Sequence, residues 1–298
     1  MLVTGFGSRV WPHDTGGVGV GRTGGPTAGG ARGLVLACHP LPAAAVTVLT
    51  TVLAAAAGAR GPILGLLAAA VLAGQLCVGW TNDLLDRDRD RAVGRLDKPL
   101  ALDLVSAPAV RAAAVAAGVS CVPLSLGLGP APGLAHLTAV GGALAYDLGL
   151  KRTWWSWAPY AVGFGLLPVV VWLVSPRETL PPTWMIIAGA FLGIGAHGAN
   201  VLPDYAGDRA TGTLGLPQRL SLAVLRIGTA AALMTALALL ILGPAGSPQP
   251  WEWAAFGAGA GLAMLSAAGP ARGRTSFPAA VAVGALAVAV LVARSAWG

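Results

Sequence analysis

The sequence predicts an all-α membrane protein, a polytopic bundle of about nine transmembrane helices. Of its 298 residues, 55% are hydrophobic and only 10% are charged, whereas an ordinary soluble domain has about 25% charged residues. So few charged side chains cannot cover a water-facing surface. Apolar stretches of about 20 residues, the length that crosses a bilayer core, follow one another along the chain, which indicates one membrane domain.

The first 33 residues are rich in glycine and lack the continuous apolar core of a signal peptide. We expect a disordered, cytoplasmic tail at residues 1–33 and a single membrane domain at residues 34–298. The fourth apolar segment of that domain is short and mildly polar. The nine predicted spans cover residues 34–57, 62–81, 104–127, 133–149, 157–175, 183–203, 220–243, 251–269 and 276–294.

The basic residues predict the topology, because cytoplasmic loops are enriched in Lys and Arg. If the tail is cytoplasmic, the loops after spans 2, 4, 6 and 8 are cytoplasmic too. The tail and these regions hold all of the 19 Lys and Arg residues except Arg60, Arg177 and Arg294. The C-terminus is then outside. Topology and an anion site account for the net charge of +7, so we expect a lipid bilayer and no nucleic acid as partner.

An acidic motif closes the second span, from Asn82 to Asp90. On a helix, Asp83, Asp86 and Asp90 fall within about 60° of one another, whereas Asp88 points to the opposite side. Carboxylates stacked on one face repel each other unless a cation lies between them. Mg²⁺ takes one or two carboxylates and completes its shell with water and phosphate oxygens. The alternative is a solvent-exposed charged segment with Asp–Arg ion pairs along it. Such a segment would have no reason to continue the face of an apolar helix.

A second polar cluster closes the sixth span, on the same predicted side of the membrane. Asn200, Asp204 and Asp208 have a spacing of four residues, which again makes one helical face. Pro203 can kink the helix there and help to aim the aspartates. Independent interfacial caps are the alternative interpretation. Two carboxylate clusters at equivalent helix ends suggest two metal sites that hold one polyanion.

Phosphate needs positive charge beyond Mg²⁺, and Arg and Lys supply it. Arg95 and Lys151 are the strongest candidates near the acidic motifs. Each basic residue taken singly is more typical of a positive-inside anchor at the membrane surface than of a phosphate ligand. His39 and His136 are interpreted as packed or interfacial. His197 lies one turn before the second cluster, so a role in the binding pocket stays an alternative for it.

These residues resemble the motifs of the UbiA superfamily of intramembrane prenyltransferases, which includes a terpene cyclase branch. The resemblance covers residues 34–294. Lys98 stands where Arg is commoner, and the five-residue spacing of Tyr146 and Lys151 resembles only some branches. The matched positions are Asn82, Asp83, Asp86 and Asp90, then Arg95 and Lys98-Pro99, then Tyr146, Leu150 and Lys151, and finally Asp204 and Asp208.

The resemblance implies helices around a central cavity, with an isoprenoid diphosphate held through two or more Mg²⁺ ions and its tail in apolar surroundings. The five motif aspartates are the expected metal ligands. The expected catalytic residues are these ligands together with one lysine: Asp83, Asp86, Asp90, Asp204, Asp208 and Lys151. The expected diphosphate-binding residues are Asn82, Arg95, Lys98, Tyr146, Lys151, Arg152 and Asn200.

Three functions stay open at this point. The allylic cation left by the diphosphate is captured by an acceptor (an aromatic ring, a quinone precursor or a lipid alcohol), or by its own double bonds as in a terpene cyclase. A transporter or lipid-binding protein is the third, although the acids lie at helix ends rather than at the midplane. Indole faces stabilise cations but also mark membrane interfaces. The tryptophans in question are Trp80, Trp154, Trp155, Trp157, Trp172 and Trp184.

Overall fold

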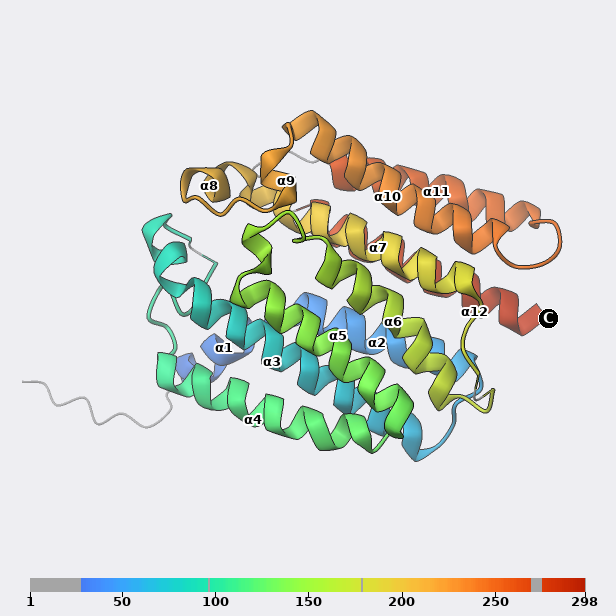
Figure 1. Ribbon diagram of the computed structural model, residues 1–298, viewed down its shortest axis with the longest axis horizontal. Helices are drawn as coiled ribbons and strands as arrows, with labels where there is room; N and C mark the ends of the chain where they lie inside the picture. The colour runs from blue at the N-terminus through green and yellow to red at the C-terminus, as the bar shows by residue number, and fades with distance from the viewer. Residues whose placement is uncertain (1–27, 96, 178, 269–274, 298) are drawn as a thin grey trace, which may run out of the picture.

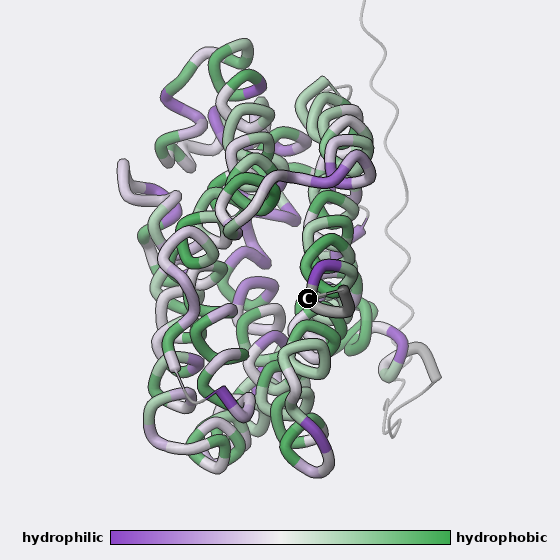
Figure 2. Tube along the Cα trace, turned by 90° about the vertical axis from the view of Figure 1, so that its right-hand side faces the viewer, coloured by the Kyte–Doolittle hydropathy of each residue, from purple (hydrophilic) through white to green (hydrophobic). Residues whose placement is uncertain are grey.

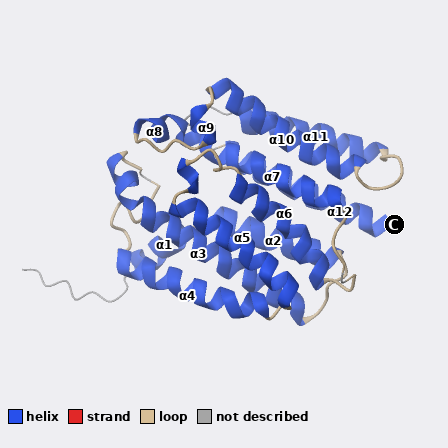
Figure 3. Cartoon of the chain, in the orientation of Figure 1, coloured by secondary structure: helices blue, strands red, loops and turns tan. Residues whose placement is uncertain are grey.

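The computed structural model describes residues 28–95, 97–177, 179–268 and 275–297, which form helices and loops without any strand (Figure 3). Residues 1–27 of the predicted tail lie outside the described residues. The first helix, α1, covers Ala28–Ala37. Residues 28–33, which the sequence assigned to the tail, are therefore helical.

Each of the nine predicted spans overlaps one long helix. Helix α3 differs most from its predicted span, because it continues to Ala92, well beyond residue 81. Its polar C-terminal turns extend an apolar helix. The long helices are α2 (Pro40–Ala56), α3 (Pro62–Ala92), α4 (Ala107–Leu126), α5 (Pro130–Leu148), α6 (Ala158–Val174), α7 (Thr183–Val201), α10 (Leu222–Leu242), α11 (Pro250–Ala268) and α12 (Ser276–Trp297).

The chain is a multi-pass membrane protein. Five segments of the described chain are long and apolar enough to cross a bilayer, and the bent pair Gly30–Ala37 and Pro40–Ala56 adds a sixth. Helix α6 is apolar but shorter. The number of nine crossings therefore stays a prediction, although nine long helices are present among the described residues.

Local sequence signals set the helix starts. Pro40, Pro62 and Pro130 each begin a helix, where the missing N–H of proline costs no hydrogen bond. Ser106 and Ser221 precede α4 and α10, and each hydroxyl accepts a hydrogen bond from the backbone N–H three residues later.

The long helices lie side by side in one bundle (Figure 1). Its two largest apolar clusters join different sets of helices: one includes Ala54, Leu67 and Val171, and the other includes Leu237 and Val283. Hydrophobic residues dominate the helices, as Figure 2 shows. The end of α3 and the short helices α8 (Tyr205–Ala210) and α9 (Leu216–Arg219) gather at the left end in Figure 1.

A sharp break between α1 and α2 carries the chain to the end of α3. His39 adopts the left-handed conformation, with φ 56° and ψ 67°, which is uncommon for a residue other than glycine. The two helices are bent by 58° at this break. Gly79 of α3 makes the approach possible, because a Cβ there would collide with the carbonyl oxygen of Cys38.

We expect Gly79→Ala to lower the free energy of unfolding by about 1–3 kcal/mol, since overpacking against backbone cannot be relieved by a rotamer change. Gly65→Ala on the same helix is the matched control, because its Cβ would meet no atom within 4 Å. Thermal unfolding of both variants in one detergent measures the difference. Equal midpoints for the two variants would show that the α1–α2 break does not depend on this contact.

Candidate functional site

The predicted helical phase of the first acidic motif is confirmed. Asp83, Asp86 and Asp90 are 2%, 3% and 2% exposed, respectively, whereas Asp88 is exposed. Because α3 continues through the motif as one helix, the three carboxylates lie on the face that its apolar turns bury. The α3 carboxylate face, as we call these three aspartates, forms one wall of the site.

Two buried lysines neutralise this wall. The Nζ atom of Lys98 lies 2.6 Å from Oδ1 of Asp83, and the Nζ atom of Lys151 lies 2.7 Å and 2.8 Å from the two carboxylate oxygens of Asp86. Lysine is almost never buried without a charged partner. The loop after α3 and the short 3₁₀ helix η1 (Leu150–Arg152) therefore bring both predicted phosphate-binding lysines to the α3 carboxylate face.

Arg89 joins the two acidic motifs, and Arg95 links the second motif to the loop after α3. Arg95 donates a 2.6 Å hydrogen bond to Asp204 and also binds Asp97, and the contacts with Asp97 and Asp204 raise its pKa above its ordinary value. Arg89 lies 3.8 Å from Asp208 and 3.0 Å from Asp86. The two motifs, far apart in the sequence, thus share one charged network.

The second motif does not lie on one continuous helix. Helix α7 ends at Val201, Asp204 closes the 3₁₀ helix η2 (Leu202–Asp204), and Asp208 lies in α8. Pro203 stands at this break, as the sequence suggested. The face predicted from a spacing of four residues is therefore interrupted, yet both aspartates still line the same polar cavity.

Several residues of the site escaped the sequence analysis. His39, interpreted as packed or interfacial, places its Nε2 atom 3.0 Å from Asp83 Oδ1 and 3.1 Å from Lys98 Nζ. Asp147 accepts a 2.7 Å hydrogen bond from Asn82, and its position next to the predicted Tyr146 was the available signal. No sequence pattern predicts the left-handed turn that aims His39.

The remaining predicted residues divide between the site and its surroundings. Tyr146 and Asn200 line the site, and Asn200 donates a 3.3 Å hydrogen bond to the hydroxyl of Tyr160. His197 is buried behind these groups, with its ring packed against Tyr146 and Tyr160. Arg152 is exposed and does not line the polar cavity.

Two cavities of opposite character meet at this site. A polar cavity of about 190 Å³ is lined by Asp86 of the first acidic motif and by Asp204 and Asp208 of the second, together with Arg95, Lys98 and Lys151. Asp83 and Asp90 are not among its lining residues. An apolar cavity of about 350 Å³ runs between the helices. Four residues line both cavities, and we call them the boundary residues: His39, Asn82, Tyr146 and Asn200. A molecule with a charged head and an apolar tail fits this arrangement.

The donor set fits Mg²⁺. The carboxylate atoms Asp83 Oδ2, Asp90 Oδ1 and Asp147 Oδ2 are buried and make no hydrogen bond to any described residue, a state that a nearby cation relieves. Within the described part of the chain, no three His, Cys, Asp or Glu residues already form a metal cage. Mg²⁺ does not require one, because phosphate oxygens and water supply most of its ligands.

Comparison with known proteins agrees with the resemblance of the motifs. The model of the UbiA prenyltransferase family matches residues 44–283. The chain belongs to this family. Membership at this level supports a membrane enzyme that uses a prenyl diphosphate, and it confirms the resemblance of the motifs. No curated protein sequence matches the chain.

Solved UbiA structures share the fold. A UbiA homologue from Aeropyrum pernix K1 is 19% identical, with a TM-score of 0.61 over 84% of this chain and 97% of that one. A homologue from Archaeoglobus fulgidus bound to GPP and Mg²⁺ is 14% identical, with a TM-score of 0.63 over 89% and 99%. A digeranylgeranylglyceryl phosphate synthase is 12% identical, with a TM-score of 0.56 over 89% and 98%.

We expect Lys98→Met to destabilise this UbiA protein by about 3–5 kcal/mol, because it leaves the buried Asp83 carboxylate without its closest cation. The double variant Lys98→Met/Asp83→Asn should recover part of the loss, since no charge is then stranded. Arg152→Met is the matched control and should change stability by less than about 0.5 kcal/mol. Unfolding midpoints in detergent measure all three, and an unchanged midpoint for Lys98→Met would contradict the pairing.

Proposed function

We propose that this protein is a Mg²⁺-dependent membrane prenyltransferase, which ionises an isoprenoid diphosphate and transfers the prenyl group to an acceptor. One observation carries the proposal: the polar cavity, which carboxylates from both acidic motifs line, shares the boundary residues with the apolar cavity. The diphosphate lies in the first cavity and the isoprenoid tail in the second. The homologue that was solved with GPP and Mg²⁺ supports this assignment.

The five motif aspartates hold the metal in this proposal: Asp83, Asp86, Asp90, Asp204 and Asp208. When bound, Mg²⁺ offsets the charge that builds up on the leaving diphosphate. Lys151, Lys98 and Arg95 already stand between the carboxylates at hydrogen-bond distance. Their ammonium and guanidinium groups donate to the diphosphate oxygens while the C–O bond breaks and its electron pair moves to the leaving oxygen.

The allylic cation forms at the boundary between the cavities. Tyr146, Tyr160 and Phe164 line the apolar cavity, and aromatic rings stabilise a cation that lies over their faces. The acceptor is an aromatic ring, a quinone precursor or a lipid alcohol, and its nucleophilic atom has to come within about 3.5 Å of the cation.

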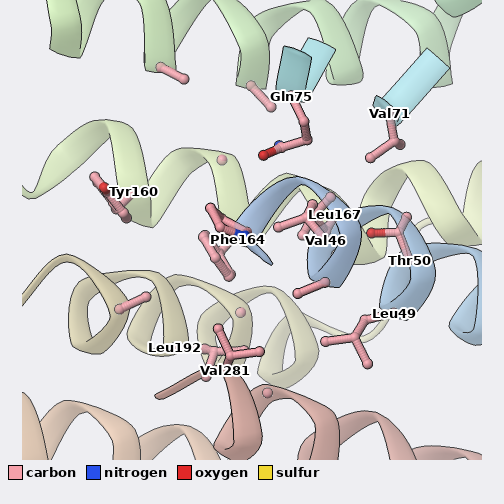
Figure 4. Close-up of a pocket in the computed structure, with 18 of the residues that line it drawn as sticks. Val46, Leu49, Thr50, Val71, Gln75, Tyr160, Phe164, Leu167, Leu192 and Val281 are labelled. Atoms are coloured by element: carbon pink, nitrogen blue, oxygen red, sulfur yellow. The ribbon is translucent and has the colours of Figure 1, made fainter. Parts of the chain in front are cut away.

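The tryptophans do not support cyclisation. None of the described residues that line the apolar cavity, some of which Figure 4 shows, is a Trp. Trp154 and Trp155 are exposed instead, and Trp80 donates a hydrogen bond to the backbone of Leu34. These positions fit the interfacial role of tryptophan. We therefore keep transfer as the proposal and treat cyclisation as an outcome of the test.

The site faces the cytoplasm in this proposal. The α1–α2 break, the loop after α3 and the α5–α6 link all contribute residues to the polar cavity, and the basic loops at this end obey the positive-inside rule. The C-terminus then lies on the other side of the membrane. Labelling of single cysteines introduced at each end of the bundle in intact cells tests this orientation.

The test is incubation of the purified protein in detergent with Mg²⁺ and geranyl, farnesyl, geranylgeranyl or geranylfarnesyl diphosphate. Pyrophosphate release that needs an aromatic or lipid acceptor supports transfer. A cyclic hydrocarbon or alcohol formed without acceptor identifies a terpene cyclase instead. Diphosphate binding without release of pyrophosphate under any condition identifies a lipid-binding or transport protein.

We expect Asp83→Ala and Asp204→Ala each to lower turnover by at least about 100-fold, the scale of losing one group that stabilises transition-state charge. Asp88→Ala is the matched control on the same helix and should retain most activity, because Asp88 is exposed and points away from the site. Pyrophosphate release measures all three variants. Full activity of Asp83→Ala and Asp204→Ala would refute the two-motif model.

A further inference from the structure

The apolar cavity contains three polar side chains far from the diphosphate site. Thr50 of α2, Gln75 of α3 and His136 of α5 line it among aliphatic residues. We call these three residues the mid-cavity polar patch. Figure 4 shows Gln75 and Thr50 extending into the cavity beside Val46, Val71 and other aliphatic residues. A cavity wall that contacts only hydrocarbon does not require polar side chains.

The patch has free hydrogen-bonding capacity. The amide of Gln75 and the hydroxyl of Thr50 make no hydrogen bond to any residue that the structure describes. Leaving a buried amide or hydroxyl without a partner is unfavourable. Water is the usual partner of such groups in a roomy polar site, so hydrocarbon placed there has to displace it.

His136 adds an acceptor to the patch. Its Nδ1 atom lies 2.8 Å from the hydroxyl of Ser125, and that hydroxyl donates its own proton to the carbonyl of Cys121. The Nδ1–H group must therefore be the donor to Ser125. In a neutral ring the Nε2 atom then carries the lone pair, and it makes no hydrogen bond to the described residues.

The patch lies at a defined depth. Gln75 precedes the boundary residue Asn82 by seven positions on α3, which corresponds to about 10 Å along the helix. His136 precedes the boundary residue Tyr146 by ten positions on α5, or about 15 Å. An extended carbon chain advances about 1.2 Å per bond, so one isoprene unit spans about 5 Å. The third isoprene unit from the diphosphate reaches the patch.

We propose that the mid-cavity polar patch determines the length of the prenyl donor, so that a chain of two isoprene units is preferred over a chain of three. The inference rests on the proposed function and names its substrate class. The first two units pass the boundary residues and apolar side chains without covering the patch, and burying each unit tightens binding by more than tenfold. The third unit gains apolar burial but strands Gln75, Thr50 and His136, which offsets the gain.

The experiment measures binding of non-hydrolysable S-thiolodiphosphates of dimethylallyl, geranyl, farnesyl and geranylgeranyl chains to the full-length protein with Mg²⁺, by calorimetry in nanodiscs. In the natural protein, the geranyl analogue should bind more than tenfold tighter than the dimethylallyl analogue, and the farnesyl analogue no tighter than the geranyl analogue. Gln75→Met removes the amide at similar volume and should tighten farnesyl binding about tenfold, with geranyl affinity changed less than about threefold.

Thr50→Val, a second variant of similar shape, should change the farnesyl-to-geranyl ratio in the same direction and keeps the test independent of how Gln75→Met folds. Leu167→Met is the matched control on an apolar wall of the same cavity, and its ratio should stay that of the natural protein. Affinity that rises steadily through farnesyl, with one ratio in all proteins, overturns the inference alone. Failure of every analogue to bind overturns the proposed function, and this inference with it.

Discussion

The structure depends on one electrostatic constraint: carboxylates buried at the end of an apolar helix need cations beside them. Asp83, Asp86 and Asp90 are nearly inaccessible to solvent, so positive groups have to come from other parts of the chain. Lys98 arrives from the loop after α3 and Lys151 from η1. Ion pairs therefore hold these two connections against the end of α3.

Sequence patterns predicted what depends on a single helix. The burial of Asp83, Asp86 and Asp90 and the exposure of Asp88 follow from a period of 3.6 residues, because α3 runs without a break through the motif. The burial of Lys151 and the exposure of Arg152 could not be predicted, since these neighbours lie in a 3₁₀ turn whose orientation depends on packing.

Tertiary contacts determined the rest of the site. His39 reaches Asp83 only because the chain turns left-handed between α1 and α2 and because Gly79 admits the carbonyl of Cys38. The roles of isolated polar residues within apolar spans could not be predicted for the same reason. Gln75 and His136 lie on different helices, and their common cavity appears only when α3 and α5 are packed together. The number of tryptophans likewise does not predict which of their rings face the cavity.

The charged network also constrains how a ligand can enter. Its cations are already engaged: Lys151 and Arg89 by Asp86, Lys98 by Asp83 and Arg95 by Asp204. A diphosphate alone would take these cations from their carboxylates and leave buried anions unpaired, at a cost of several kcal/mol per charge. In the proposed function, a divalent cation that arrives with the diphosphate would remove this cost, because the freed carboxylates would hold it while the lysines and the arginine turn to phosphate. Coupled binding of metal and diphosphate is therefore a consequence of how the protein neutralises its own acids.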